Sequence, residues 1–342
     1  MKAKSTLVGL LGALVIGAFT VGSSTAMAGD ISGAGATFPY PIYSKWADAY
    51  KTKTGIGLNY QSIGSGGGIK QITNKTVTFG ASDMPLKPEK LKEIGVIQWP
   101  MIIGGVIPVA NIPGVKPGEL TIDGKTLAAI YMGEIKKWND PALKALNPSA
   151  NLPNMAIAPV HRSDGSGTTF LFSTYLSNTS PAWAEKVGAN TSIDWPAGIG
   201  AKGNEGVASM TTQTPGGIGY VEYAYVVQNH MTYMKMINKD GAVVSPTAEA
   251  FQAAAANADW KNAPGFYLLL TNQPGKASWP IVGASFILMY KSPTDPKASQ
   301  TALDFFNWAY HNGQEMAKSL DYVPIPMEVV KLVNDEWSMI KR

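Results

Sequence analysis

Three segments of this chain share an order that limits the folds open to it: an apolar strand, a turn of small residues and then a helix. They lie at residues 31–50, 58–72 and 155–176, and each turn combines glycine with serine or threonine. The apolar residues after each turn are spaced to line one face of a helix. Repeated strand–turn–helix units predict an α/β fold built on an open sheet.

The third turn, at residues 163–169, places charged and hydroxyl side chains at the expected start of a helix. Ser166 or Asp164 is the predicted N-cap. The unpaired N–H groups and the positive dipole end of a helix start favour an anion, and Arg162 can add a forked, charge-assisted contact. An ordinary capped helix with a surface Arg162–Asp164 pair would produce the same pattern.

The first 28 residues have the pattern of a secretory signal. Lys2 and Lys4 precede the uncharged residues 7–21, and Ala26-Met27-Ala28 matches an A-x-A site, so cleavage is expected after Ala28. A membrane anchor is the alternative, but fifteen residues with three glycines are short for a span. We therefore predict a soluble protein, exported to the periplasm by a cleavable signal peptide.

The composition excludes several kinds of site. The chain contains no cysteine, which removes thiolate metal sites and a lipid anchor on an N-terminal cysteine, and its three histidines are too few for a His-rich site. We expect neither a metal nor a cofactor. The net charge is +4, and loss of the two signal lysines leaves +2. Because this charge is slight and no basic run carries interleaved aromatics, nucleic-acid binding is not expected.

The mature length predicts two domains. Two long apolar runs, residues 101–110 and 281–290, are expected to be buried strands at which the chain crosses between them. This predicts domain I at residues 29–105 and 283–342, and domain II at residues 106–282. The C-terminal part is expected to form core-packed helices.

Polar residues lie at the predicted carboxyl ends of three strands. Thr37 follows the first strand, Ser65 the second, and Asp83 ends a third at residues 77–83. Ligands bind at this edge of open α/β sheets, so the three side chains are expected to lie together. Plainer alternatives exist: Thr37 as a helix cap, Asp83 as a turn former, and the glycine-rich residues 64–68 as a linker. The glycine-rich turn lacks the Gly-Lys-Ser/Thr ending of a P-loop, which argues against an ATPase.

Asp83 is informative about the ligand, because a carboxylate should repel an anion. The conflict disappears if the anion still carries a proton, which the carboxylate accepts in a hydrogen bond. Fully ionised sulfate has no proton to donate. Since an unmade hydrogen bond to a buried charge costs about 1.5–3 kcal/mol or more, Asp83 predicts strong discrimination against sulfate.

Four separated motifs follow one another along the chain: residues 33–39 (GAGATFP), 64–68 (GSGGG), 79–83 (FGASD) and 162–168 (RSDGSGT). In this order they closely resemble the periplasmic phosphate-binding proteins of phosphate ABC transporters. The resemblance runs from the cleavage site nearly to the C-terminus and includes residues 219–225. It implies an α/β, two-domain type II periplasmic binding fold, hinged by two crossover strands and closing on one phosphate ion in the interdomain cleft.

The resemblance also implies a ligand set, carried over motif by motif: Thr37, Phe38 through its N–H, Ser65, Asp83, Arg162, Ser166, Gly167 and Thr168. It implies that Asp164 pairs with Arg162 and supports it, and that a monomer without catalytic activity delivers phosphate to membrane permease subunits. The chain departs from some relatives at Gly66, where they have a second serine, and at His161, where they have a second arginine. Neither change removes an implied ligand, although His161 would add a pH dependence.

Three other functions fit parts of the sequence. An exported phosphohydrolase would use Ser65 or Ser166 as its nucleophile, but no G-x-S-x-G elbow is present and bases are few. The same fold could bind arsenate, molybdate, sulfate or a small phosphorylated molecule, and Asp83 argues only against sulfate. A surface adhesin has only the nine tryptophans and fourteen tyrosines in its favour, and their spacing fits a protein core.

Overall fold

The computed structural model describes residues 30–341 and is organised around one long strand, β4 (Val96–Ala110), in which every residue is buried. Its first part pairs antiparallel with β12 (Val282–Tyr290), and its second part pairs antiparallel with β8 (Gly217–Glu222). The partner changes between Gly105 and Val106. The apolar runs expected to be crossing strands are therefore β4 and β12.

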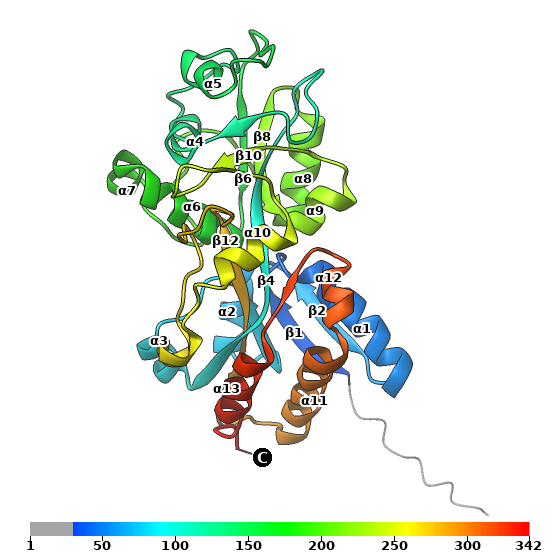
Figure 1. Ribbon diagram of the computed structural model, residues 1–342. Helices are drawn as coiled ribbons and strands as arrows, with labels where there is room; N and C mark the ends of the chain where they lie inside the picture. The colour runs from blue at the N-terminus through cyan, green and yellow to red at the C-terminus, as the bar shows by residue number, and fades with distance from the viewer. Residues whose placement is uncertain (1–29, 342) are drawn as a thin grey trace, which may run out of the picture.

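The fold is α/β with two domains, as predicted, and both are built on the sheet that β4 runs through (Figure 1). We call residues 29–105 and 283–342 lobe I and residues 106–282 lobe II; these boundaries stay a prediction. The strand order is β2-β1-β3-β12-β4-β8-β6-β7, and β9 and β13 also pair with β4. A second, three-stranded sheet has the order β11-β10-β5. The remaining strands are β1 (Ile31–Gly35), β2 (Leu58–Ser62), β3 (Phe79–Ser82), β5 (Thr121–Ile122), β6 (Ala158–Arg162), β7 (Ile199–Ala201), β9 (Thr232–Tyr233), β10 (Lys235–Ile237), β11 (Val243–Val244) and β13 (Val323–Pro324).

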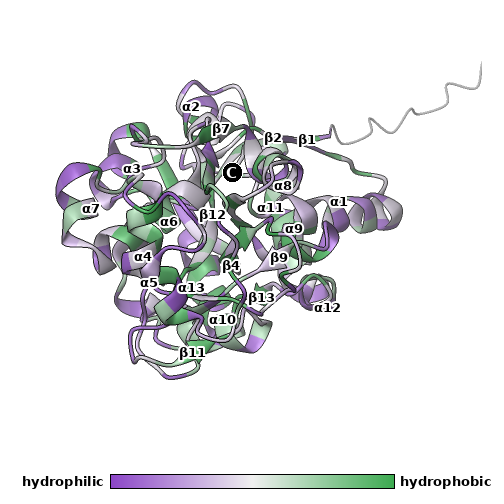
Figure 2. Ribbon diagram, turned by 90° about the horizontal axis from the view of Figure 1, so that it is seen from above, coloured by the Kyte–Doolittle hydropathy of each residue, from purple (hydrophilic) through white to green (hydrophobic). Residues whose placement is uncertain are grey.

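Helices cover both parts of the sheet, with hydrophobic residues along the central strands and hydrophilic ones on the outer helices (Figure 2). In the part of the chain that the structure describes, no helix is both long and apolar enough to cross a bilayer. The signal peptide predicted at residues 1–28 lies outside this part. The helices are α1 (Tyr40–Thr54), α2 (Ser65–Thr73), α3 (Pro88–Ile94), α4 (Gly124–Tyr131), α5 (Pro141–Leu146), α6 (Gly167–Thr179), α7 (Pro181–Lys186), α8 (Gly203–Gln213), α9 (Tyr223–Gln228), α10 (Ala248–Ala255), α11 (Pro296–Asn312), α12 (Gln314–Lys318) and α13 (Met327–Trp337), with two 3₁₀ turns, η1 (Trp260–Asn262) and η2 (Pro264–Phe266).

The strand register brings the carboxyl ends of several strands to one place. Gly35, the last residue of β1, pairs with Ser62 of β2 and with Ala81 of β3. In lobe II, Arg162 at the end of β6 pairs with Ala201 at the end of β7. Because strands β1, β2 and β3 are parallel, and so are β6 and β7, the turns after them leave the sheet on the same side.

The C-terminal helices pack into the core, as predicted. Ala302, Phe305, Phe306 and Ala309 are all buried on α11, and Gly313 follows the helix as its C-cap. Aromatic contacts continue this core, since Trp99 of β4 meets both Phe306 and Trp337 edge-on. The tryptophans that could have suggested an adhesive surface include several that are fully buried.

Gly68 lets α2 lie directly on the sheet, which in turn positions Ser65 at the start of the helix. A Cβ atom on Gly68 would lie 2.6 Å from Cα of Gly35 and 2.7 Å from the carbonyl oxygens of Ala34 and Ala81. These are backbone atoms of β1 and β3, so they cannot turn aside as a flexible side chain could.

Gly68→Ala should therefore lower the free energy of unfolding by about 1–3 kcal/mol, because α2 must move away from the sheet. Gly206→Ala is the matched control: it also lies inside a helix, but a Cβ there would meet its nearest neighbour at 3.5 Å, an ordinary contact. Since alanine favours helix over glycine, Gly206→Ala should be neutral or stabilising. Denaturant unfolding of the mature protein measures both. Equal stability of Gly68→Ala and wild type would contradict the close packing of α2.

Candidate functional site

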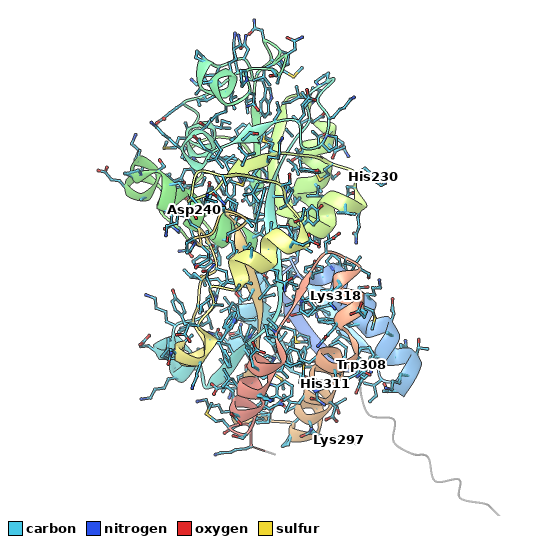
Figure 3. All side chains as sticks on the ribbon, viewed as in Figure 1. His230, Asp240, Lys297, Trp308, His311 and Lys318 are labelled. Atoms are coloured by element: carbon cyan, nitrogen blue, oxygen red, sulfur yellow. The ribbon has the colours of Figure 1, made fainter. Side chains whose placement is uncertain are left out.

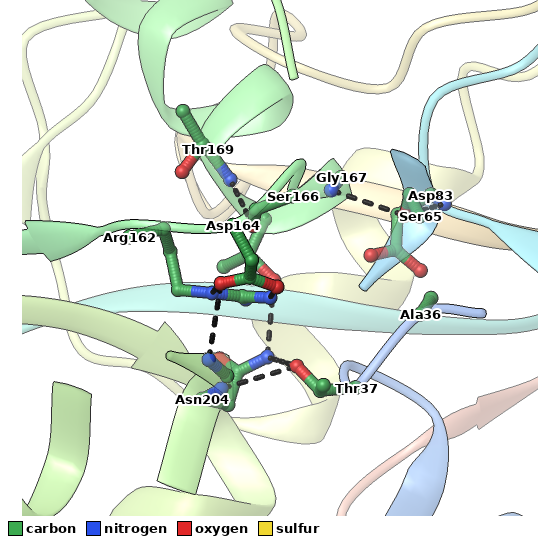
Figure 4. A network of polar contacts seen from close by, with 12 residues as sticks. Ala36, Thr37, Ser65, Asp83, Arg162, Asp164, Ser166, Gly167, Thr169 and Asn204 are labelled. Atoms are coloured by element: carbon green, nitrogen blue, oxygen red, sulfur yellow. Dashed lines mark hydrogen bonds and ion pairs between the residues drawn. The ribbon is translucent and has the colours of Figure 1, made fainter. Parts of the chain in front are cut away.

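The polar residues singled out in the sequence come together between the lobes, in the turns after β1, β3 and β6 and at the starts of α2 and α6 (Figure 4). Phe38 and the six polar residues are buried, with at most 4% of their surface exposed: Thr37, Ser65, Asp83, Arg162, Ser166 and Thr168. Such complete burial of hydroxyl and charged groups is costly unless hydrogen bonds satisfy them. The bonds that they make define what the site can still bind.

Thr37 of lobe I is held by Asn204 of lobe II. Its Oγ1 accepts hydrogen bonds from the backbone N–H of Asn204 at 3.1 Å and from the Nδ2 amide at 2.7 Å. A hydroxyl oxygen has two lone pairs, and both are used here, so the hydroxyl proton of Thr37 is left to be donated elsewhere. The plainer alternative, in which Thr37 caps α1, is wrong. The N-cap residue of α1 is Pro39, and no side-chain hydrogen bond caps this helix.

Ser65, the first residue of α2, shows the same arrangement. Its Oγ accepts hydrogen bonds from the N–H groups of Asp83 at 3.1 Å and of Gly167 at 3.0 Å. The second bond joins the lobes, and a Cβ on Gly167 would lie only 2.5 Å from Oγ of Ser65 and from Oδ2 of Asp83. Glycine at position 167 is therefore required for the lobes to meet, and the proton of Ser65 is also free to be donated.

The start of α6 supplies two further hydroxyls. Ser166 is the N-cap, because its Oγ accepts from the N–H of Thr169 at 3.0 Å; Asp164, the alternative cap, makes other bonds. Oγ1 of Thr168 accepts from Nδ2 of Asn204 at 3.1 Å. Both hydroxyls thus act as acceptors toward the protein and keep a proton to donate. No preceding turn of α6 can accept from the backbone N–H of Thr168, which adds a donor at the positive end of the helix dipole.

Asp83 is the exception among these donors, because its carboxylate can only accept. It is 1% exposed, and Oδ1 has no hydrogen-bond partner among the described residues. Burial raises the pKa of Asp83 to about 7, although the buried hydroxyl of Ser285, the charge of Arg162 and the hydroxyl of Ser65 lower it in part. An unpaired, buried carboxylate oxygen is costly, so this atom indicates a position for a hydrogen-bond donor from outside the chain.

Arg162 and Asp164 form the predicted pair. Nε of Arg162 donates to Oδ1 at 2.7 Å and Nη2 donates to Oδ2 at 2.5 Å, while the N–H of Gly203 also donates to Oδ1 at 3.1 Å. Burial alone would raise the pKa of Asp164, but these bonds and the charge of Arg162 outweigh it and lower the pKa. The two bonds fix the plane of the guanidinium and leave Nη1 outside the pair.

Asn204 is a buried residue of this site that the sequence did not assign. It lies at the start of α8, after the glycine-rich residues 198–203, where its side chain donates to Thr37 and Thr168 and its Oδ1 accepts from the N–H of Glu222 at 2.9 Å. The strand β7 and the helix α8 form a further strand–turn–helix unit. Its turn carries glycine with lysine and asparagine in place of serine or threonine, so it lacks the hydroxyl residue that marks the other three turns.

The histidines do not gather at the site. His230 and His311 are exposed, one in lobe II and one on α11 (Figure 3). The His161 ring stacks on Trp195 with ring centroids 4.6 Å apart, and burial lowers its pKa although two backbone hydrogen bonds oppose this. The lowered pKa disfavours the charged form of His161 at neutral pH. Residues 30–341 contain no group of three or more histidine, aspartate or glutamate side chains that could hold a metal ion.

Together these residues suit a small oxyanion. Four hydroxyls with protons to donate, helix N–H groups and the guanidinium of Arg162 provide donors, and Oδ1 of Asp83 provides one acceptor. Both lobes contribute, since Thr37, Ser65 and Asp83 belong to lobe I and the others to lobe II. Phe38 follows Thr37 in the same turn, and its carbonyl accepts from the Tyr322 hydroxyl at 2.7 Å.

Comparison with known proteins places the chain in a family. Residues 20–312 match the model of the PBP superfamily domain. The phosphate-binding protein PstS of Haemophilus influenzae is 51% identical over 337 residues, which cover 98% of each chain. PstS of Pasteurella multocida is 51% identical over 319 residues and 93% of each chain. The archaeal PstS of Methanocaldococcus jannaschii is 33% identical over 90% of this chain and 85% of its own.

Solved structures agree in fold. A periplasmic phosphate-binding protein, PfluDING, bound with phosphate, aligns with a TM-score of 0.70 at 22% identity, over 90% of this chain and 93% of its own. A putative phosphate ABC transporter substrate-binding protein from Clostridium perfringens, with bound phosphate, aligns with a TM-score of 0.63 at 19% identity, over 87% of this chain and 100% of its own. This chain belongs to the PBP superfamily and, within it, to the family of the phosphate-binding proteins PstS.

Proposed function

We propose that this protein binds one inorganic phosphate ion between its lobes, in the periplasm, and delivers it to the permease of an ABC transporter. The proposal is carried by the buried set of hydroxyl donors around the carboxylate of Asp83, whose Oδ1 has no hydrogen-bond partner among residues 30–341. The ligands are those implied by the motifs: Thr37, Phe38, Ser65, Asp83, Arg162, Ser166, Gly167 and Thr168, with Asp164 holding Arg162 and Asn204 holding two of the hydroxyls.

The polarity of the site favours phosphate over sulfate. Phosphate near neutral pH carries at least one proton and can donate it to Oδ1 of Asp83 while its other oxygens accept from the hydroxyls. Sulfate would place a lone pair against the carboxylate, so that both groups are buried without a bond. Arsenate has the same protonation and nearly the same shape, and we expect it to bind as well.

Binding without turnover fits the serines better than phosphohydrolase activity does. Oγ of Ser65 is fixed by two backbone N–H groups, and Oγ of Ser166 caps α6, so both side chains form part of the wall. A nucleophilic serine needs a base that accepts its proton and is itself held in place. An aryl phosphate assay tests this directly, and steady release of the aryl product would contradict the proposal.

The proposed partners follow from the family and from the site. All the ligands come from one chain, so a monomer suffices. The relatives carry the name of phosphate-binding proteins, and a structural neighbour is described as an ABC transporter substrate-binding protein. The charged start, apolar run and A-x-A site of residues 1–28 support export through a cleaved signal.

A calorimetric titration of the mature protein, residues 29–342, tests the function after bound ligand has been removed. At about pH 8, phosphate should bind one to one, and sulfate should bind far more weakly than phosphate. The variant Asp83→Asn should bind phosphate about ten- to a hundredfold more weakly and should accept sulfate, because its amide can donate to a sulfate oxygen. Asp48→Asn, on the exposed face of α1, is the matched control and should behave as wild type. Unchanged preference for phosphate in Asp83→Asn would contradict the role of Asp83.

The affinity for sulfate should rise as the pH falls, because the pKa of Asp83 is raised. That pKa is about 7, so a growing fraction of Asp83 carries a proton as the pH falls. The protonated carboxyl can donate to sulfate, and the affinity for sulfate should rise about tenfold between about pH 8 and about pH 6. Phosphate should change less, because either partner can supply the shared proton. A sulfate affinity that is flat in wild type, or that rises equally in Asp83→Asn, would exclude this explanation.

Removing the Asn204 side chain should weaken phosphate binding, although every residue that is proposed to contact phosphate stays in place. Asn204→Ala leaves Oγ1 of Thr37 and of Thr168 without their amide donor, so neither hydroxyl is oriented. We expect the dissociation constant to rise about tenfold, the usual effect of one or two lost buried hydrogen bonds. Asn334→Ala, at an exposed position of α13, serves as the control in the same titration. An unchanged constant for Asn204→Ala would show that these hydroxyls do not depend on it.

A further inference from the structure

Glu222 is a buried acid next to the site that the proposed phosphate ligands do not include. It ends β8 and caps α9, where its Oε2 accepts from the N–H of Ala224 at 2.9 Å. Its surface is fully buried, and Oε1 has no hydrogen-bond partner among residues 30–341. An isolated carboxylate is strongly disfavoured in such a place, so the residue requires a physical explanation.

Tyr322 connects Glu222 to the turn that is proposed to hold phosphate. Its hydroxyl lies 2.8 Å from Oε2 of Glu222 and 2.7 Å from the carbonyl oxygen of Phe38. Both neighbours are acceptors when Glu222 is ionised, but a phenol has only one proton. The two contacts can both be full, two-centre hydrogen bonds only if Glu222 carries a proton. In that state Glu222 donates to the phenolic oxygen, and Tyr322 donates to Phe38.

The charged and titratable groups around Glu222 would not stabilise a negative charge on its carboxylate. The carboxylate of Asp83 adds a like charge from the end of β3, and Tyr223, Tyr225 and Tyr322 contribute phenols that are neutral at pH 7. On β4, Gly104 also faces this group: a Cβ there would lie 3.1 Å from Oε1 of Glu222 and 2.9 Å from the Phe38 ring. The nearby cation of Arg162 is paired with Asp164. Burial raises the pKa of Glu222 well above its usual value, and Asp83 adds to this, although hydrogen bonds lower it in part.

The bond between Tyr322 and Glu222 joins the two lobes. Phe38 and Tyr322 belong to lobe I, whereas Glu222 belongs to lobe II and pairs with Val106 at the point where β4 changes partner. If the lobes separate, Glu222 loses the phenol and gains water, and an acid in water is ionised at neutral pH. Closing the lobes then requires a proton from the solvent.

We propose that Glu222 is a positioning residue that takes up one proton when the lobes close on phosphate, and that this proton completes the chain of hydrogen bonds from Glu222 through Tyr322 to Phe38. This inference rests on the proposed function, because phosphate is the ligand that closes the lobes. The proton comes from the buffer and resides on the Glu222 carboxyl. Phosphate affinity thereby depends on pH through a group that does not touch the ion.

Calorimetric titration of the mature protein with phosphate at about pH 8, in buffers with different ionisation enthalpies, counts the protons taken up per ion bound. Glu222→Gln is the informative variant, because its amide can donate to the phenolic oxygen and preserves both contacts without a titratable proton. Wild type should take up close to one proton more than Glu222→Gln, and the slope of log affinity against pH should differ by about one between them. Phosphate and Asp83 titrate in both proteins and cancel in the difference.

Equal proton uptake and equal slopes in the two proteins would overturn the inference while leaving the proposed function intact. No phosphate binding by wild type would instead contradict the proposed function. If Glu222→Gln does not fold, infrared difference spectroscopy of wild type replaces it. Phosphate should produce a protonated-carboxyl band that shifts when glutamate is labelled with ¹³C, and a band that does not shift would belong to Asp83 and would overturn the inference.

Discussion

The hydroxyl groups between the lobes have their oxygens occupied as acceptors by protein N–H groups. Oγ1 of Thr37 and Oγ of Ser65 each receive two such bonds, so their protons have no remaining role except donation. Ser166 and Thr168 each receive one. These residues thus present a set of oriented donors around the Asp83 carboxylate, whose Oδ1 lacks a partner in the part of the chain that the structure describes. In the proposed function, a site with this polarity recognises an oxyanion by its proton as well as by its charge.

The fold makes this arrangement possible because strand ends from both lobes meet across β4. The turns after β1 and β3 carry the lobe I residues, and those after β6 and β7 carry the lobe II residues. Several of the bonds that orient the donors cross between the lobes, from Gly167 to Ser65 and from Asn204 to Thr37. The donors are therefore fully oriented only when the lobes lie together. This links recognition of the ion to closure around it.

Much of this organisation is predictable from the sequence. The strand–glycine–helix units indicate the turns, and the two apolar runs at 101–110 and 281–290 indicate the strands β4 and β12, because these features depend on local spacing and on burial. The pairing of Arg162 with Asp164 follows from the motif that contains both.

Other features depend on contacts between residues far apart in sequence. Thr37 precedes a helix and resembles a cap, yet its hydroxyl oxygen accepts a hydrogen bond from Asn204 of the other lobe, 167 positions away. Asn204 follows a turn without a serine or threonine, and nothing local marks it. Glu222 and Tyr322, 100 positions apart, meet only because β8 and the chain before β13 both reach β4. Such residues carry no periodicity or motif of their own.

Neutron diffraction from crystals of the phosphate complex, exchanged into heavy water, locates the protons on which this recognition depends. The hydroxyl deuterons of Thr37, Ser65, Ser166 and Thr168 should point at phosphate oxygens, and one deuteron should lie between the ion and Oδ1 of Asp83. Hydroxyl deuterons directed at protein acceptors, or an ion whose oxygens lie away from Asp83, would contradict this recognition.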